Sequence, residues 1–110
     1  MNRYDYIISG CGAAGLQLAL AMSEDSFFQN KRILLLDADY KRANDRTWCW
    51  WELGSGRWDD IITKSWKHAD FMSDTFEKTI DLGDYSYKML RSADFYVYAS
   101  ERLRACASLE

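Results

Sequence analysis

Three glycines near the start of the chain have the spacing of a phosphate-binding loop. Gly10, Gly12 and Gly15 follow an apolar segment in the order Gly-x-Gly-x-x-Gly. Gly10 permits a tight turn off a strand, Gly12 lets the backbone approach a pyrophosphate, and Gly15 lets the next helix pack closely. Unpaired N–H groups and the helix dipole attract negative charge at a helix N-terminus. We therefore predict that these glycines, with Ala13 and Ala14 between them, bind the pyrophosphate of a dinucleotide.

An acidic residue stands where such a loop requires one. Asp37 ends the apolar run Ile33–Leu36 and follows Gly15 by 22 residues, close to the roughly 20 expected for the acid that binds the ribose hydroxyls. Asp39 is a second candidate, but Asp37 is preferred because it ends the run directly. The alternative is a glycine-rich turn in another kind of α/β protein. It is disfavoured because the match covers a whole strand–helix–strand unit.

The elements that position this motif are a strand, a helix and a second strand, expected at residues 4–9, 12–24 and 32–37. A polar connector covers 25–31. Because a helix separates the two strands, we expect them to be parallel with a right-handed crossover.

The rest of the chain predicts short strands and a second helix. We expect an irregular segment at residues 38–55 and two strands that can pair at 65–72 and 76–82. A third strand is expected at 85–90 and a helix at 92–105. Ser92 is the expected N-cap of that helix. The predicted fold class is α/β, with a Rossmann-like FAD/NAD(P)-binding βαβ unit, an accessory β-meander and a C-terminal helix.

Composition and charge disfavour several classes of protein. A hydrophobic content of 48% indicates a chain that buries a core rather than a disordered segment. A net charge of −3 gives no electrostatic reason to expect nucleic acid binding. No apolar run approaches the roughly 18 residues that indicate a membrane span, and no signal-peptide pattern precedes the glycines. We expect a cytoplasmic protein.

The cysteines predict neither a disulfide nor a metal site. Cys11, Cys49 and Cys106 are far apart in the sequence, and only His68 can supply an imidazole. Cys11 lies inside the glycine loop and suggests redox chemistry, but a small residue that fills a tight turn is the preferred interpretation.

We expect the sheet to be incomplete. A Rossmann-type sheet needs further parallel strands, each with its own crossover, and few residues follow the helix that ends near Ala105. Residues 1–108 are therefore expected to be the N-terminal part of an FAD-binding domain, and residues 109–110 a cloning scar. The alternative is an autonomous mini-domain, whose uncovered sheet edge favours homo-oligomers.

A tryptophan-rich segment, NDRTWCWWE at residues 44–52, stands out from an ordinary loop. Large aromatic side chains beside a nucleotide site commonly form an apolar wall or cover a flat ligand. The alternative is that the tryptophans at 48, 50 and 51 fill the core. Asp45 and Arg46 can likewise be no more than a local ion pair.

The order of the glycine motif, the run ILLLDAD and the segment NDRTWCWW resembles the N-terminus of the lycopene cyclase family. These flavoproteins resemble the p-hydroxybenzoate-hydroxylase-like FAD enzymes in fold. The resemblance covers essentially all of this chain and about the first third of such an enzyme. The tryptophan segment narrows the match from dinucleotide-binding proteins in general to this family. The chain departs from the family pattern at Tyr40, a position where proline is expected.

The resemblance implies an FAD enzyme of carotenoid biosynthesis that cyclises the ψ-ends of lycopene to β-ionone rings. The reaction has no net redox change but is thought to require reduced flavin, with NADPH as the expected reductant. Electron-rich flavin and aromatic faces can stabilise the carbocation that forms when a carboxylic acid protonates the alkene. The family's acid lies beyond residue 110, so the catalytic residue is unknown.

The resemblance also assigns roles by position. The three glycines would accommodate the FAD pyrophosphate, Asp37 would bind the adenosine ribose, and Arg46 would lie on the FAD side. Arg91 resembles an arginine that related flavoproteins place near the cofactor; the alternative is a surface arginine at the start of a helix. A hydrophobic carotenoid substrate implies peripheral contact with a membrane.

Two other functions stay open from the sequence. One is an FAD-dependent oxidoreductase or monooxygenase of the same superfold, because a fold does not fix its chemistry. The other is a non-catalytic remnant, and we expect the 110 residues alone to be inactive and to bind FAD weakly or not at all.

Overall fold

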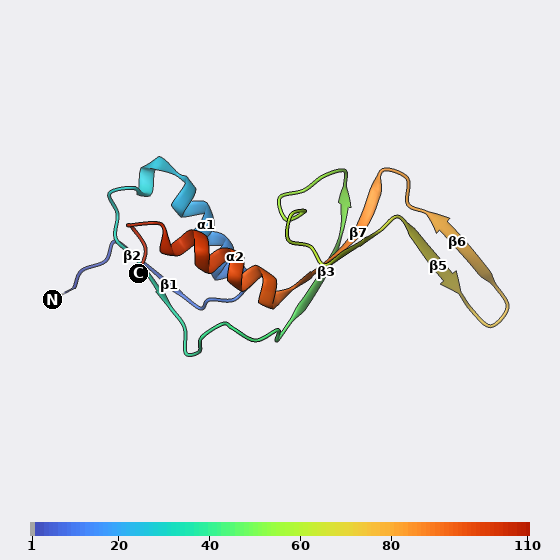
Figure 1. The fold of residues 1–110 in the computed structure, drawn as a ribbon, viewed down its shortest axis with the longest axis horizontal. Coiled ribbons are helices and arrows are strands. Elements are labelled where there is room, and N and C mark those ends of the chain that lie inside the picture. Colours follow the sequence, from blue (N-terminus) through green and yellow to red (C-terminus); the bar gives the residue numbers. More distant parts are fainter. Residues whose placement is uncertain (1) are drawn as a thin grey trace. The chain divides into compact units, whose positions relative to one another are not determined.

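The computed structural model describes residues 2–110; Met1, the first residue of the predicted domain, lies outside them. Between residues 2 and 110 a strand and a helix come first, a run of strands follows a short 3₁₀ helix, and a second long helix comes last (Figure 1). In chain order the elements are β1 (Tyr6–Ser9), α1 (Ala13–Glu24), the 3₁₀ helix η1 (Ser26–Phe28), β2 (Ile33–Leu36), β3 (Thr47–Leu53), β4 (Lys64–Trp66), β5 (His68–Met72), β6 (Glu77–Asp81), β7 (Tyr85–Arg91) and α2 (Ser92–Arg104).

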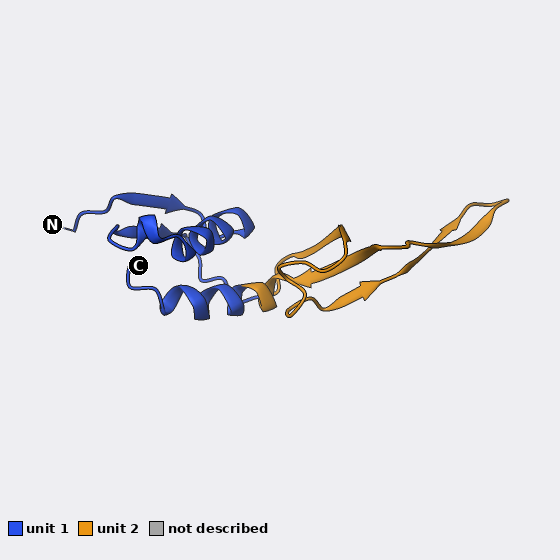
Figure 2. Cartoon of the chain, turned by 90° about the horizontal axis from the view of Figure 1, so that it is seen from above, with its two compact units in different colours: residues 1–43, 96–110 blue, residues 44–95 orange. Residues whose placement is uncertain are grey.

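The chain divides into two compact units, which Figure 2 shows in different colours. The first unit contains residues 1–43 and 96–110, and the second contains residues 44–95. The fold is therefore mixed α/β, as predicted, with several separate sheets.

The first unit contains the predicted parallel pair. β1 and β2 are parallel, with Tyr6 opposite Ile33 and Ser9 opposite Leu36. The core of this unit consists of apolar side chains from both strands and both helices: Ile8, Leu16, Ala19, Leu20, Met22, Ile33, Tyr96, Ala99 and Leu103. Fully burying one large apolar side chain stabilises a fold by roughly 1.5–3 kcal/mol, so this core holds α1 against the sheet.

The last residues of the chain run beside β2. Leu109 forms a parallel bridge with Ile33, whose N–H donates to the Ser108 carbonyl at 2.8 Å. The Glu110 carboxylate accepts from the Tyr4 hydroxyl at 2.6 Å and pairs with Arg32 at 2.7 Å. Residues 108–110 therefore extend the parallel pair on the β2 side.

The second unit corrects two sequence predictions. Residues 47–53, expected to be irregular, form β3, and the strand order in the sheet is β3–β7–β4. A simple meander would pair neighbouring strands, whereas β7 pairs with β3 and β4 in antiparallel fashion. Aromatic side chains at consecutive positions obscure the alternation by which strands are recognised.

A third correction concerns residues 65–72, which were expected to form one strand. They are divided at Lys67 between β4, in the three-stranded sheet, and β5. β5 pairs with β6 in a separate two-stranded sheet, with Met72 opposite Glu77, so the predicted hairpin near Ser73 is present. Its strands are short and mostly exposed.

The start of α2 is capped from a distant part of the chain. The Ala93 N–H donates to the Asn44 side-chain oxygen at 3.2 Å. Ser92, the predicted N-cap, is fully buried, and its hydroxyl instead donates to Asp45 at 3.0 Å and accepts from the Arg46 N–H at 3.0 Å. The segment before β3 is thereby fixed to the start of α2.

Candidate functional site

The glycine loop has the geometry that its spacing requires. Gly10 follows β1 with a φ of +104°, a backbone conformation that other residues rarely adopt. A Cβ placed on Gly15 would overlap the carbonyl oxygen of Gly10, so glycine is needed where α1 crosses the loop. Nothing lies within 4 Å of a Cβ placed on Gly12, which faces open space.

The N-terminus of α1 has unsatisfied backbone donors. Gly12 is the N-cap residue, and no side chain of the described chain caps it; the first turn contains no acidic residue. The first N–H groups of a helix lack partners within the helix, and the helix dipole makes this end electropositive. The turn that begins with Ala13 and Ala14 is therefore suited to bind an anion.

Asp37 contacts the glycine loop directly. One of its carboxylate oxygens accepts from the Cys11 N–H at 2.6 Å, and the other accepts from the Asp39 N–H at 2.9 Å. Its side chain is 17% exposed, with the Lys41 ammonium 3.9 Å away. The N–H groups of Cys11 and then Asp39 hold the pKa of Asp37 below its usual value, so it is ionised at neutral pH.

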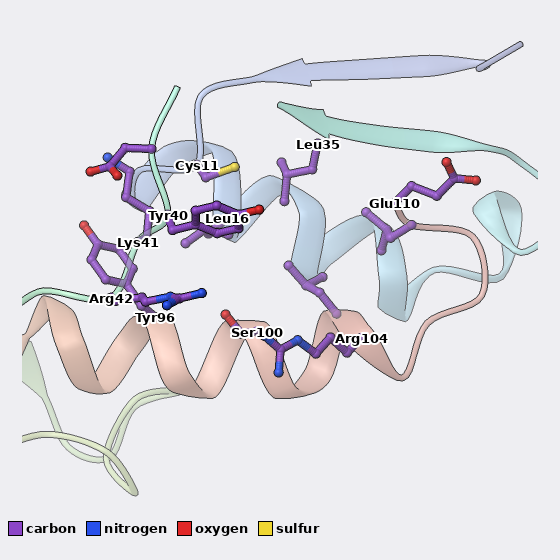
Figure 3. A pocket seen from close by; sticks show the side chains of 13 residues that line it. Cys11, Leu16, Leu35, Tyr40, Lys41, Arg42, Tyr96, Ser100, Arg104 and Glu110 are labelled. Carbon is purple, nitrogen blue, oxygen red and sulfur yellow. The ribbon is translucent and has the colours of Figure 1, made fainter. Parts of the chain in front are cut away.

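A cavity of about 560 Å³ lies in the first unit beside the glycine loop (Figure 3). Cys11 and Leu16 contribute from the loop and α1, and Ser100 contributes from α2. Its other lining residues are Leu35, Asp39, Tyr40, Lys41, Arg42, Tyr96, Leu103, Arg104, Leu109 and Glu110. Three of these are cationic and two are acidic, so the lining has a small excess of positive charge.

Two of the predicted cofactor residues belong to the second unit. The Arg46 side chain is exposed, and its backbone pairs with Ser92. Arg91 binds Asp94 three residues later, with 3.0 Å between Nε and the nearer carboxylate oxygen. This contact is the local arrangement expected of an arginine that begins a helix. Within the first unit the structure brings the glycine loop and Asp37 together, and Arg46 and Arg91 are part of the second unit.

The match to known families decides what this chain is. The family model described as lycopene cyclase protein matches residues 5–108, nearly the whole chain. The chain belongs to the lycopene cyclase family. Neither the curated proteins nor the solved structures gave a significant match.

The tryptophans on β3 of this cyclase-family chain lie on both faces of the strand, Trp48 and Trp50 on one and Trp51 on the other. Trp48 packs edge-on against Phe95, with ring centroids 5.6 Å apart, and the Trp50 indole N–H donates to Glu52 at 3.0 Å. Trp51 lies on the other face, 57% exposed, with its ring 4.6 Å from that of Tyr87. The core interpretation therefore applies to Trp48, whereas Trp51 is available for contact.

A buried lysine organises the polar part of the same sheet. Lys88, 3% exposed, donates to Asp59 at 2.6 Å, to Glu52 at 3.0 Å and to the Gly54 carbonyl at 3.1 Å. The pKa of Lys88 is raised above its usual value, and its hydrogen bond to Asp59 is the largest cause. The pKa of Asp59 is lowered by Lys88, and that of Glu52 by the Trp50 indole and Lys88. This network fixes residues 54–59 to the sheet.

Sequence analysis did not identify the basic residues of the cavity. Lys41 and Arg42 are adjacent and follow β2 closely. Because ligands bind at the carboxyl ends of parallel strands, this position in the sequence could have predicted them as site residues. Arg104 is at the end of α2, and nothing in the sequence marks it as a cavity residue. Lys88 was also missed, because Asp59 and Glu52 are 29 and 36 residues away in the sequence.

The structure adds three further observations. All three cysteines are free. Between residues 2 and 110, no cluster of three or more His, Cys, Asp or Glu side chains is arranged to hold a metal ion. Over the same residues, neither helix has the length and apolar character needed to cross a membrane.

Proposed function

We propose that this chain is the N-terminal FAD-binding region of a lycopene cyclase, which converts the ends of lycopene to β-ionone rings. The observation that carries the proposal is the open N-terminus of α1, in a chain of the lycopene cyclase family. An uncapped helix start beside a cavity suits the diphosphate of a dinucleotide.

The residues around the loop fit such a ligand. The N–H groups of Ala13, Ala14 and Gly15 would hold the diphosphate, since the Cys11 N–H already donates to Asp37. The open space at Gly12 leaves room for phosphate oxygens against the backbone. A side chain at this position would occupy that space.

Asp37 is the proposed ligand of the adenosine ribose. A carboxylate offers about four acceptor sites, and the two oxygens of Asp37 accept hydrogen bonds from the backbone N–H groups of Cys11 and Asp39. Its lowered pKa keeps it an acceptor for hydroxyl groups. Asp39 lines the cavity and is the neighbouring candidate. Lys41, whose ammonium is 3.9 Å from the Asp37 carboxylate, adds positive charge to the cavity lining.

When bound, reduced FAD supplies the electron-rich ring that the family reaction is thought to require. The residues of this chain bind and orient the adenine half of the cofactor. The proton donor is expected outside these 110 residues, in the remainder of a longer enzyme.

The test is to purify the cyclase that carries this sequence and to measure bound flavin and lycopene turnover. We expect an FAD absorption spectrum and conversion of lycopene to cyclic products when the flavin is reduced without oxygen. An enzyme that leaves lycopene unchanged but consumes NADPH and oxygen with another substrate would be the oxidoreductase of the same superfold. An enzyme without flavin would refute the cofactor assignment.

A further inference from the structure

One aromatic side chain of the cavity does not belong to the core of the first unit. Within residues 2–110, the aromatic side chains that line the cavity are those of Tyr40 and Tyr96 (Figure 3). Tyr96 is 3% exposed and belongs to the core, whereas Tyr40 is 81% exposed. The Tyr40 ring therefore buries little surface within the fold and is available to a ligand of the cavity.

An arginine lies over one face of the Tyr40 ring. The Arg42 guanidinium carbon is 5.0 Å from the ring centroid, and the Arg42 N–H donates to the Tyr40 carbonyl at 2.9 Å. These two contacts restrict the turn at residues 40–42. Because the ring is so largely exposed, its other face stays accessible. An aromatic ring with an accessible face can stack with a second flat ring.

Tyr40 is close to the group that we assign to the ribose. Asp37 is three residues earlier, and its carboxylate is 3.9 Å from the ammonium of Lys41, the residue after Tyr40. The Asp39 N–H donates to the same carboxylate at 2.9 Å, so the segment after β2 turns back toward Asp37. In a nucleotide the base is joined directly to the ribose. A base on a ribose held by Asp37 would therefore reach this turn, where Tyr40 offers its ring.

The cavity has the mixed lining that a nucleotide base requires. Its volume of about 560 Å³ is within the roughly 300–1,000 Å³ of small-molecule pockets. Its apolar lining includes Leu16, Leu35 and Leu103, which suit the faces of a flat ring. The Arg42 guanidinium and the Ser100 hydroxyl can donate hydrogen bonds to ring nitrogens. The lining therefore suits a flat heterocycle better than a purely apolar ring.

We propose that Tyr40 stacks against the adenine base of the dinucleotide whose diphosphate lies at the N-terminus of α1. This inference rests on the proposed function and adds to it a binding residue for the base. The ligand class follows from the chemistry of the site. Open helix N–H groups suit a diphosphate, and the Asp37 carboxylate suits ribose hydroxyls. An exposed ring beside them suits the remaining part of a nucleotide, which is its base.

The experiment measures nucleotide binding by the whole cyclase after its flavin has been removed. Tyr40→Leu removes the ring, and Tyr40→Phe keeps the ring without the hydroxyl. Phe27→Leu is the matched control, because Phe27 is a 63% exposed aromatic residue of the first unit outside the cavity lining. Isothermal titration calorimetry with FAD, ADP and inorganic pyrophosphate gives three Kd values for each protein. Pyrophosphate is the probe that lacks both the base and the ribose.

We expect Tyr40→Leu to raise the Kd for FAD and for ADP about tenfold. Removal of a ring that stacks on a base typically weakens binding by roughly fivefold to a hundredfold. The Kd for pyrophosphate should stay within about threefold of wild type, because the glycine loop is unchanged. Tyr40→Phe and Phe27→Leu should stay within about threefold for all three probes. Since Tyr40 is exposed, circular dichroism should show the same unfolding midpoint for every variant.

Three results would overturn the inference and leave the FAD assignment intact. The first is equal affinity of wild type and Tyr40→Leu for FAD and ADP. The second is a loss in Tyr40→Leu that pyrophosphate shares, because the change would then lie in the glycine loop. The third is an equal loss in Tyr40→Phe, because the contact would then belong to the hydroxyl group. A wild-type protein that binds neither FAD nor ADP would overturn both proposals.

Discussion

Replacing Gly15 with alanine tests the packing of α1 on the glycine loop. The new Cβ would overlap the carbonyl oxygen and approach the carbonyl carbon of Gly10. Both are backbone atoms, so no rotation of a side chain relieves the overlap. α1 must instead shift away from the end of β1.

The expected cost follows from two opposing effects. Overpacking costs about 1–3 kcal/mol, and rigid backbone contacts place Gly15→Ala at the upper end of that range. Alanine is favoured over glycine inside a helix by about 1 kcal/mol. We therefore expect a net loss of about 2 kcal/mol, which lowers the unfolding midpoint by roughly 10 °C for a domain of this size.

Gly12→Ala is the matched control for stability. Nothing lies within 4 Å of the new Cβ, and the backbone at Gly12 has a φ of −79°, which alanine adopts readily. The loss should stay below about 1 kcal/mol, the effect of a poorer N-cap residue. Thermal unfolding followed by circular dichroism measures both variants. If Gly15→Ala unfolds at or above the wild-type midpoint, the close contact does not constrain the helix.

Two further predictions concern the second unit. The pKa values of Glu52 and Asp59 are lowered in the folded chain. Their pairing with Lys88 therefore stabilises the fold fully at a pH above the ordinary carboxyl pKa values near 4, and this stabilisation is lost as the pH falls through the lowered pKa values. The free energy of unfolding of Lys88→Met should therefore be lower than that of wild type at pH 7, and the difference should shrink toward pH 3. Urea unfolding at several pH values measures this difference. A difference that does not depend on pH would contradict the prediction. Asn44→Ala removes the acceptor for the Ala93 N–H and should destabilise the unit by about 1 kcal/mol, the usual effect of a lost cap. An unchanged urea midpoint for that variant would show that water replaces the Asn44 side chain.

The first unit was largely predictable from the sequence because its signals are local. The expected helix 12–24 and strand 32–37 agree with α1 and β2 to within a residue at each end. Gly10 and Gly15 mark a turn and a close approach that depend on a few neighbouring residues. The predicted parallel pairing of β1 with β2 is confirmed.

The second unit was less predictable because its structure depends on distant pairing. β3 was missed because aromatic residues lie on both faces, which removes the contrast between apolar and polar positions. The Lys88 network forms only once β3 and β7 pair in register, and no local pattern indicates it. The same pairing places Trp48 on the packed face of the sheet and Trp51 on the exposed one.

Flavin content of the purified cyclase, wild type against Gly12→Val, tests the central claim most directly. The valine side chain would fill the open space beside the N-terminus of α1, where we propose that the diphosphate binds. We predict about one FAD per wild-type chain and an FAD affinity reduced at least about tenfold in Gly12→Val, with an unchanged circular dichroism spectrum. Equal FAD binding by the two proteins, or a wild-type protein without flavin, would contradict the account.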